Sequence, residues 1–340
     1  MYSKAFAPEY QGVLGSALSV NSSYEEVLAK ATEEQRESVL GYARAGLAVA
    51  EANRRLGRVT DAERAWRDSY RAAHRAGDSA AMAWALWSGG TLARQRGRLA
   101  LARRWLSAAA ECAERGGDRI ARGYALAGLA ETGRIQGDYA AVTELHEQLL
   151  AEARAHGEAR HTVWALEGIA QMHRNTGSYD TALAMFEEAA EIARHGEDAR
   201  GHAWALRGIA DVLSVRGETE RALELLTEAE VVCRAMRLES ALAYNHKMRG
   251  NVLFRAGRYE EAREVYSGAL EEFRAIGEPR GEALSRLGLV KSRARLGRSA
   301  AETAAELAEL DDILHRIGLQ HARAMLRDFR AELGGQAEAA

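Results

Sequence analysis

Apolar residues recur along this chain with the spacing of α-helices, and the helices that they predict come in pairs. In the segment 204–215, Leu206, Ile209 and Leu213 fall on one side of a helix at 100° per residue. Gly217 follows, and a glycine can adopt the positive φ that ends a helix. A second amphipathic helix of roughly 16 residues comes after this glycine. The pattern therefore predicts a helix hairpin.

The hairpin recurs along the chain with a fixed period of about 40 residues. Seven glycines end the first predicted helix of successive units: Gly57, Gly97, Gly137, Gly177, Gly217, Gly257 and Gly297. The units span residues 41–80, 81–120, 121–160, 161–200, 201–240, 241–280 and 281–320. A fixed period in this range is typical of a solenoid, in which each unit packs on its neighbours. The sequence therefore predicts an all-α fold, an α-solenoid of antiparallel helix hairpins.

The two ends of the chain depart from this period. Residues 1–40 are expected to form a degenerate N-terminal capping repeat, whose first helix would run from Pro8 to about Val20. Residues 321–333 predict an amphipathic capping helix that covers the apolar end of the array. The composition of residues 334–340 predicts a disordered tail.

The turns between units carry their own signals. A second glycine follows most second helices: Gly77, Gly117, Gly157, Gly196 and Gly277. Aspartates then stand where the next helix should begin, at Asp78, Asp118 and Asp198. Because an aspartate side chain can accept a hydrogen bond from a free backbone N–H, these three residues are predicted N-caps.

With these positions assigned, the units resemble the tetratricopeptide repeat. Aligning Gly217 with the mid-repeat glycine of that family places Ala222, Leu226 and Ala229 on its second-helix positions. Small residues repeat at these positions in other units: Ala62, Ala102, Ala182, Ala262, Ala109, Ala189 and Ala269. The resemblance covers roughly residues 41–320. It implies a right-handed superhelix of about seven repeats whose first helices line a concave groove.

The chain also departs from that family. The closing proline of the family is missing, and each unit has about 40 residues where the family has about 34, which makes it a long variant of the repeat. In the third unit, Val142, His146 and Leu149 replace the usual core residues. The last unit is expected to be shifted by one residue, with Ala301 and Ala308 at the small positions.

Composition and charge exclude several classes of function. The net charge of −3 gives no basic field for nucleic acid, and no run of about 18 apolar residues predicts a membrane span. Cys112 and Cys233 lie three repeats apart and are expected to be free thiols in a cytoplasmic protein. Arginine is abundant and lysine nearly absent, which indicates codon bias in a GC-rich bacterium. No motif for a metal, nucleotide or cofactor is present.

Aromatic residues recur on the side of the first helices that faces away from the hairpin core. The repeated position is occupied by Trp84, Tyr124, Trp164, Trp204 and Tyr244, and Trp87 lies one turn beyond the first of them. By the family resemblance this is the ligand-contacting face. Rigid aromatic side chains provide large contact areas at low entropic cost, so the face is a candidate binding surface.

Basic residues share this face. The five positions that face away from the core hold eleven basic and four acidic residues over the seven units. The candidate groove includes Arg94, Arg134, Arg174 and Arg207, together with Glu131, Glu167 and Asp211. Arginine binds carboxylate and phosphate groups in a bidentate manner. The sequence therefore predicts a non-enzymatic module that binds an acidic peptide or partner segment.

Other interpretations remain open at this point. The aromatic residues can pack under the second helix of the preceding repeat, and the arginines can form a solvated face paired with glutamates. His146 is expected to be a core histidine, and the histidines near the turns match no metal site. The alternative function is a small-molecule sensor or an enzyme of specialised metabolism, with Glu131, Glu167 and Asp211 as acid–base groups.

Overall fold

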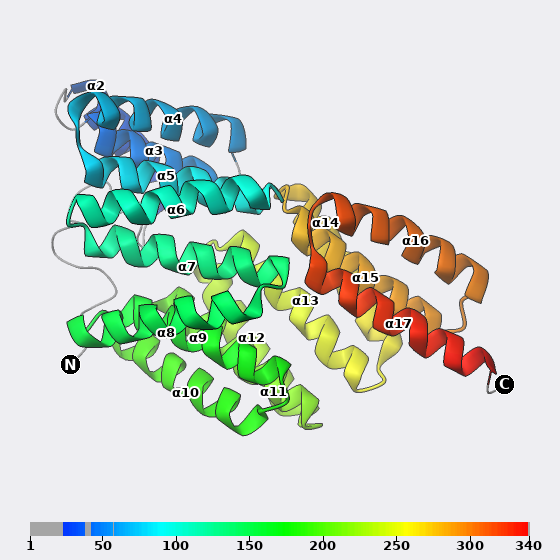
Figure 1. Cartoon of the computed structure of the whole chain (residues 1–340). Coiled ribbons are helices and arrows are strands. Elements are labelled where there is room, and N and C mark those ends of the chain that lie inside the picture. The colour runs from blue at the N-terminus through cyan, green and yellow to red at the C-terminus, as the bar shows by residue number, and fades with distance from the viewer. Residues whose placement is uncertain (1–22, 38–41, 57, 339–340) are drawn as a thin grey trace. The chain divides into compact units, whose positions relative to one another are not determined.

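The computed structural model describes residues 23–37, 42–56 and 58–338. Within these residues it contains sixteen α-helices and no β-strand, and consecutive helices pack as antiparallel hairpins, such as α9 with α10 and α14 with α15 (Figure 1). The predicted all-α fold of helix hairpins is confirmed. The expected helix from Pro8 to Val20 lies outside the described residues.

The helices are α2 (Tyr24–Glu37), α3 (Tyr42–Arg55), α4 (Val59–Ala76), α5 (Ser79–Gln95), α6 (Leu99–Arg115), α7 (Arg119–Gln136), α8 (Tyr139–His156), α9 (Ala159–Asn175), α10 (Tyr179–His195), α11 (Ala199–Val215), α12 (Thr219–Ala235), α13 (Glu239–Arg255), α14 (Tyr259–Ala275), α15 (Pro279–Arg295), α16 (Ala300–Arg316) and α17 (Gln320–Glu338).

The periodic glycines end the first helices because they adopt the left-handed conformation. All six that the structure describes have φ between 71° and 93°: Gly97, Gly137, Gly177, Gly217, Gly257 and Gly297. At Gly217 the turn is closed by two backbone hydrogen bonds, from Gly217 N to Ser214 O at 3.3 Å and from Glu218 N to Leu213 O at 3.0 Å. This is the Schellman arrangement, which satisfies carbonyl groups that the helix end leaves without partners.

The predicted N-caps are confirmed at the starts of three first helices. Asp78, Asp118 and Asp198 each accept a hydrogen bond through Oδ1 from the backbone N–H three residues later, at 2.9 Å in all three cases. Each aspartate therefore satisfies one of the free donors at the N-terminus of α5, α7 or α11.

The turns after the second helices differ from the glycine pattern in two places. Gly77, Gly117, Gly157 and Gly277 have positive φ. Gly196 does end α10, but its φ is −80°, and the left-handed residue is Glu197 with φ of 57°. Arg237, after α12, likewise has φ of 49°. Because a Cβ atom makes this conformation unfavourable, both turns are strained relative to the glycine turns.

We expect glycine at either strained position to stabilise the protein. Glu197→Gly and Arg237→Gly should each raise the free energy of unfolding by about 1 kcal/mol, because both side chains are exposed and the backbone strain is removed. Urea unfolding followed by circular dichroism measures the change. Glu187→Gly, at an exposed position within α10, is the control and should lower the same free energy by about 1 kcal/mol. A loss of stability in both turn variants would contradict the assignment.

The small residues of the repeat lie where two helices of a hairpin cross. Ala62, Ala102, Ala182, Ala222 and Ala262 are all buried, and so are Ala109, Ala189, Ala229 and Ala269. In the third unit the unusual residues Val142, His146 and Leu149 are buried at the corresponding positions. His146 is therefore a core residue, as expected. Its ring lies over Gly168, where an added Cβ would come within 2.1 Å of Nε2.

The last repeat is shifted by one residue, but in the opposite direction to the one predicted. Ala301 and Ala308 are exposed, and the buried residues of α16 are Thr303, Leu307, Leu310 and Leu314. The cause lies at the start of the helix. Ser299 caps α16 by accepting a hydrogen bond from Glu302 N at 3.3 Å, so the helix begins at Ala300, one position later than the start of α14 at Tyr259 predicts.

The chain divides into two compact units. The first comprises residues 1–94, 98–133 and 139–205, and the second comprises residues 95–97, 134–138 and 206–340. The boundary at residue 205 falls within α11. Helix α17 extends to Glu338, beyond the expected end at residue 333 and into the segment that composition predicts to be disordered. Cys112 and Cys233 are both buried free thiols.

Candidate functional site

The first three aromatic residues of the predicted face are buried in the first unit. Trp84, Trp87 and Tyr124 are at most 6% exposed and belong to one hydrophobic cluster. Their rings meet edge to face, with centroid distances of 5.0 Å from Tyr124 to each tryptophan. Trp164 extends the cluster at 4.8 Å from Tyr124 and is only partly buried. These contacts correspond to the packing interpretation of the aromatic residues for Trp84, Trp87 and Tyr124.

The polar atoms of two aromatic residues bind the first helix of the next repeat. Trp84 Nε1 donates to Asp118 Oδ2 at 2.9 Å, and Tyr244 OH donates to Glu278 Oε2 at 2.5 Å. In both cases the acid lies 34 residues after the aromatic residue and also caps a helix through its backbone contact. The aromatic residues thus join neighbouring repeats as well as forming a face.

Trp204 and Tyr244 are partly exposed and are associated with arginines. The guanidinium carbon of Arg200 lies 4.1 Å from the centroid of the Trp204 ring in the first unit. In the second unit, Arg207 and Arg280 lie 5.8 Å and 5.6 Å from the centroid of Tyr244. All three distances are within the range of cation–π interactions.

The predicted arginines are half-buried, and some are paired with acids. Arg94 Nη1 lies 3.7 Å from Glu131 Oε1. Arg174 Nη1 donates to Asn175 Oδ1 at 3.1 Å. Arg134 and Glu167 are also partly buried. The Arg94–Glu131 contact fits the interpretation in which acids hold the arginines in position.

Asp211 is buried and belongs to a network that sequence reasoning missed. Arg255 Nη1 donates to Asp211 Oδ1 at 2.7 Å and to Ser214 Oγ at 2.5 Å. Arg255 comes from the next repeat, 44 residues after Asp211, so the residue pattern within one helix does not indicate that the two side chains pair.

The three acids of the acid–base interpretation do not gain support from these contacts. Glu131 and Asp211 both pair with arginine, which is sufficient to explain their presence. Glu131 and Glu167 belong to the first unit, whereas Asp211 belongs to the second.

Among the described residues, no group of three or more His, Cys, Asp or Glu side chains could hold a metal ion. In the same part of the chain, no helix is long and apolar enough to cross a membrane.

Two buried ion pairs in the first unit were also not predicted. Arg160 Nε lies 3.2 Å from Asp198 Oδ2, and Arg160 Nη1 donates to Tyr124 OH at 2.6 Å. Glu51 accepts from Arg54 Nη2 at 2.7 Å and from Ser88 Oγ at 2.7 Å. Although burial opposes ionisation, the Arg54 guanidinium holds the pKa of Glu51 below its usual value. The carboxylate of Glu51 is therefore ionised, and both carboxylates are engaged within the protein.

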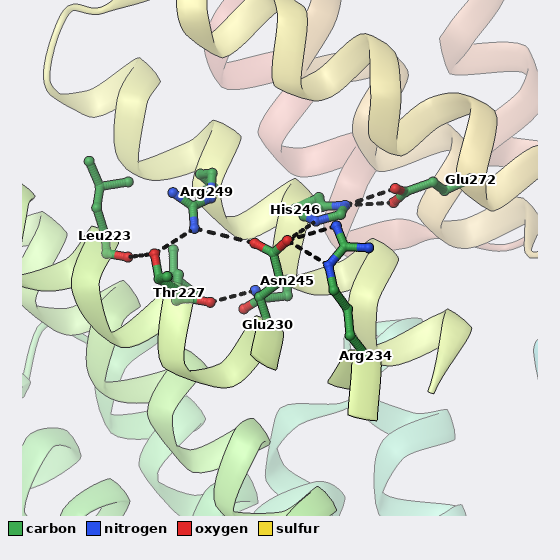
Figure 2. Close-up of polar contacts among 9 residues, drawn as sticks. Leu223, Thr227, Glu230, Arg234, Asn245, His246, Arg249 and Glu272 are labelled. Atoms are coloured by element: carbon green, nitrogen blue, oxygen red, sulfur yellow. Dashed lines mark hydrogen bonds and ion pairs between the residues drawn. The ribbon is translucent and has the colours of Figure 1, made fainter. Parts of the chain in front are cut away.

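His246 lies between two glutamates in the second unit (Figure 2). Its Nδ1 lies 2.8 Å and 2.9 Å from the carboxylate oxygens of Glu272 on α14, and its Nε2 lies 3.5 Å from Glu230 on α12. Arg234 and Arg249 also contact Glu230, at 2.7 Å and 3.5 Å. The hydrogen bond to Glu272 raises the pKa of His246, opposed by partial burial. The imidazolium form is therefore favoured here.

This contact predicts a pH-dependent part of the stability. The pKa of His246 is higher in the folded protein, so its contribution is complete below the unfolded pKa of about 6.5 and is lost as pH rises through the folded value. A charge-assisted hydrogen bond contributes about 1.5–3 kcal/mol. The free energy of unfolding should thus fall more from pH 6 to pH 8.5 in the wild type than in His246→Gln. Urea titrations at both pH values measure this, and equal falls in the two proteins would contradict it.

Comparison with known proteins agrees with the helix hairpins. Residues 161–235 match the model of the tetratricopeptide repeat. No curated protein matches the sequence. Among solved structures, a Rap protein complexed with Competence and Sporulation Factor is 14% identical, with a TM-score of 0.61 over 92% of this chain and 94% of that one.

Two further structures have similar folds. The apo form of the quorum sensor NprR from B. thuringiensis is 14% identical, with a TM-score of 0.56 over 85% of this chain and 81% of that one. A signal transduction ATPase with a tetratricopeptide repeat sensor, from Pyrococcus horikoshii, is 13% identical, with a TM-score of 0.54 over 93% of this chain and 54% of that one. At these identities the likeness concerns the fold. Residues 161–235 therefore resemble tetratricopeptide repeats, within a chain whose fold resembles those of the Rap protein and NprR.

Proposed function

We propose that this chain is a non-enzymatic binding module that holds an acidic peptide or partner segment against its first helices. The observation that carries the proposal is the pairing of partly exposed aromatic rings with arginines. In the first unit, Trp204 lies beside Arg200, and in the second unit, Tyr244 lies beside Arg207 and Arg280. Aromatic and arginine side chains are enriched where binding energy is concentrated.

The proposed contacts divide into two groups. In the first unit, Trp164, Trp204, Arg94 and Arg174 are partly exposed and would meet the ligand. In the second unit, the partly exposed candidates are Tyr244, Arg134 and Arg207. Trp84, Trp87 and Tyr124 would support them from the core, and the acids Glu131, Glu167 and Asp211 would orient the arginines. The Rap structure contains a bound factor, and NprR is a quorum sensor, so proteins of similar fold serve in recognition. A cofactor forms no part of the proposal.

The test uses defined peptide pools of equal length that are acidic, neutral or basic. Tryptophan fluorescence should show saturable binding of the acidic pool, and added salt should weaken it because exposed charges are screened. Trp164→Ala or Trp204→Ala should weaken binding by about 2 kcal/mol, roughly 30-fold, with the fold retained. Arg174→Glu should weaken it through charge.

Matched controls come from the second helices. Tyr139→Ala removes an exposed ring on α8, and Arg103→Glu reverses an exposed charge on α6. Neither should change the affinity for the acidic pool. Folded Trp164→Ala, Trp204→Ala and Arg174→Glu variants that bind as tightly as the wild type would exclude these first-helix residues as the binding surface.

A further inference from the structure

Two donors of the aromatic column have a carboxylate as their acceptor. In the first unit, Trp84 Nε1 donates to Asp118 Oδ2 at 2.9 Å, and Asp118 follows Trp84 by 34 residues. In the second unit, Tyr244 OH donates to Glu278 Oε2 at 2.5 Å across the same spacing. The fold itself thus shows which acceptor suits a donor at this position of the repeat.

At Trp164 the corresponding carboxylate is bonded to other groups. Asp198 follows Trp164 by 34 residues, and it is 2% exposed. Its Oδ1 accepts from Gly201 N at 2.9 Å, and its Oδ2 accepts from Arg160 Nε at 3.2 Å. Arg160 also donates through Nη1 to Tyr124 OH at 2.6 Å, so two partners hold its guanidinium in place. Arg160 therefore takes the oxygen that corresponds to the acceptor of Trp84.

The indole N–H of Trp164 makes no hydrogen bond within the part of the chain that the structure describes. Trp164 is partly exposed, and its Nε1 is not a buried atom. The ring is nevertheless held in position, with its centroid 4.8 Å from that of Tyr124 and 5.6 Å from that of His161. A donor that is already fixed and accessible loses little entropy when it binds an acceptor.

We propose that Trp164 is a specificity-determining residue whose indole N–H donates a hydrogen bond to a carboxylate of the bound ligand. The ligand carboxylate would correspond to that of Asp118 beside Trp84. The inference rests on the proposed binding of an acidic segment and deepens it, because it assigns one acid of that segment to one donor. A hydrogen bond to an ionised acceptor is about twice as strong as one to a neutral acceptor, so this contact selects an acid over its amide.

The test compares Trp164→Phe with the wild type, because phenylalanine keeps an aromatic ring but lacks the N–H. The ligands are the acidic peptide pool and the same peptides with glutamine and asparagine in place of glutamate and aspartate. Trp164→Phe should weaken binding of the acidic pool about tenfold and weaken binding of the amide pool distinctly less, as measured by titration calorimetry. Equal losses for the two pools would indicate a ring contact alone and would overturn the inference.

Nuclear magnetic resonance observes the donor directly. The Nε1–H resonance of Trp164 is identified by its absence from the spectrum of Trp164→Phe. It should move downfield when the acidic pool binds, and a resonance that stays in place at saturation would contradict the hydrogen bond. Acidic peptides with an amidated C-terminus then distinguish the source of the carboxylate. Unchanged binding assigns a side-chain acid, and lost binding assigns the terminal carboxylate.

Two matched substitutions serve as controls. Trp105→Phe changes a partly exposed tryptophan on the second helix α6 and should leave binding of both pools unchanged. Trp84→Phe removes a donor that has a partner in the fold, so it should lower the unfolding temperature more than Trp164→Phe does. Equal decreases would show that the N–H of Trp164 is already bonded within the protein, which would overturn the inference.

The outcomes separate this inference from the proposed function. An acidic pool that binds the wild type and Trp164→Phe equally well overturns the role of the N–H and leaves the binding module in place. An acidic pool that does not bind the wild type overturns both.

Discussion

Asp198→Ala should lower the free energy of unfolding by about 3–5 kcal/mol. Asp198 is 2% exposed and pairs with Arg160, which is 7% exposed, so the substitution leaves a buried guanidinium without its carboxylate. It also removes the N-cap of α11, in which Asp198 accepts from Gly201 N at 2.9 Å. Urea unfolding followed by circular dichroism measures the total loss.

Three further variants separate the causes of this loss. Asp198→Asn keeps a good N-cap but removes the charge, so it reports mainly on the ion pair. Combining Asp198→Ala with Arg160→Met removes both charges, and part of the stability should return. Glu188→Ala breaks the exposed pair with Arg154 at 2.6 Å and should cost less than about 1 kcal/mol. If Asp198→Ala costs no more than Glu188→Ala, the buried pair does not stabilise the first unit as we infer.

Phe273→Ala should cost a similar amount, about 3–5 kcal/mol, by leaving a cavity in the second unit. Phe273 is fully buried, and its ring lies 4.7 Å from that of Tyr244. On its other side the ring fills the space over Gly281, where an added Cβ would come within 2.2 Å of Cδ1. Gly281 and Phe273 are therefore complementary in shape. A larger residue at position 281 alone, or a smaller one at position 273 alone, should make the packing worse.

The complementarity itself can be tested by a double substitution. Gly281→Ala alone should be destabilising because its Cβ overlaps the ring. Phe273→Leu should cost less than Phe273→Ala, and in the Phe273→Leu background Gly281→Ala should cost less than in the wild type. Unfolding free energies of the four proteins give the coupling. Additive effects would show that Phe273 and Gly281 do not pack as described.

Most of the fold could be predicted because its signals are local. A glycine such as Gly217 ends a helix through its own φ, and an aspartate such as Asp118 caps one three residues away. Three turns departed from these local preferences. Glu197 and Arg237 take a conformation that favours glycine, and Ser299 delays the start of α16 by one residue through its own cap. At Glu197 and Arg237 the backbone conformation is the one that residue preference disfavours, so the preference alone did not predict it.

The sequence predicted which residues share the candidate face, but not which of them are buried. Helix geometry placed Trp84 and Tyr124 on the side away from the hairpin core, and they do lie in one column. The stacking of repeats brings these residues, one period apart in sequence, to a ring distance of 5.0 Å, and the rings then cover each other. A signal for this was present, because an acid follows four of the five column residues at the same spacing that separates Trp84 from Asp118. Arg200 was missed although its ring partner Trp204 lies one turn later on the same helix.

The double use of the capping acids has a consequence for how such an array can change in length. Asp118 and Glu278 each start their own helix and also satisfy the aromatic residue of the preceding repeat. A first helix that is moved along the array therefore keeps this bonding only if its N-cap residue is an acid. The N-cap of α13, at the position that corresponds to Asp118, is Leu238, so α13 with this N-cap could not follow Trp84 without leaving the indole N–H without its acceptor. The repeats are alike in backbone but are not interchangeable parts.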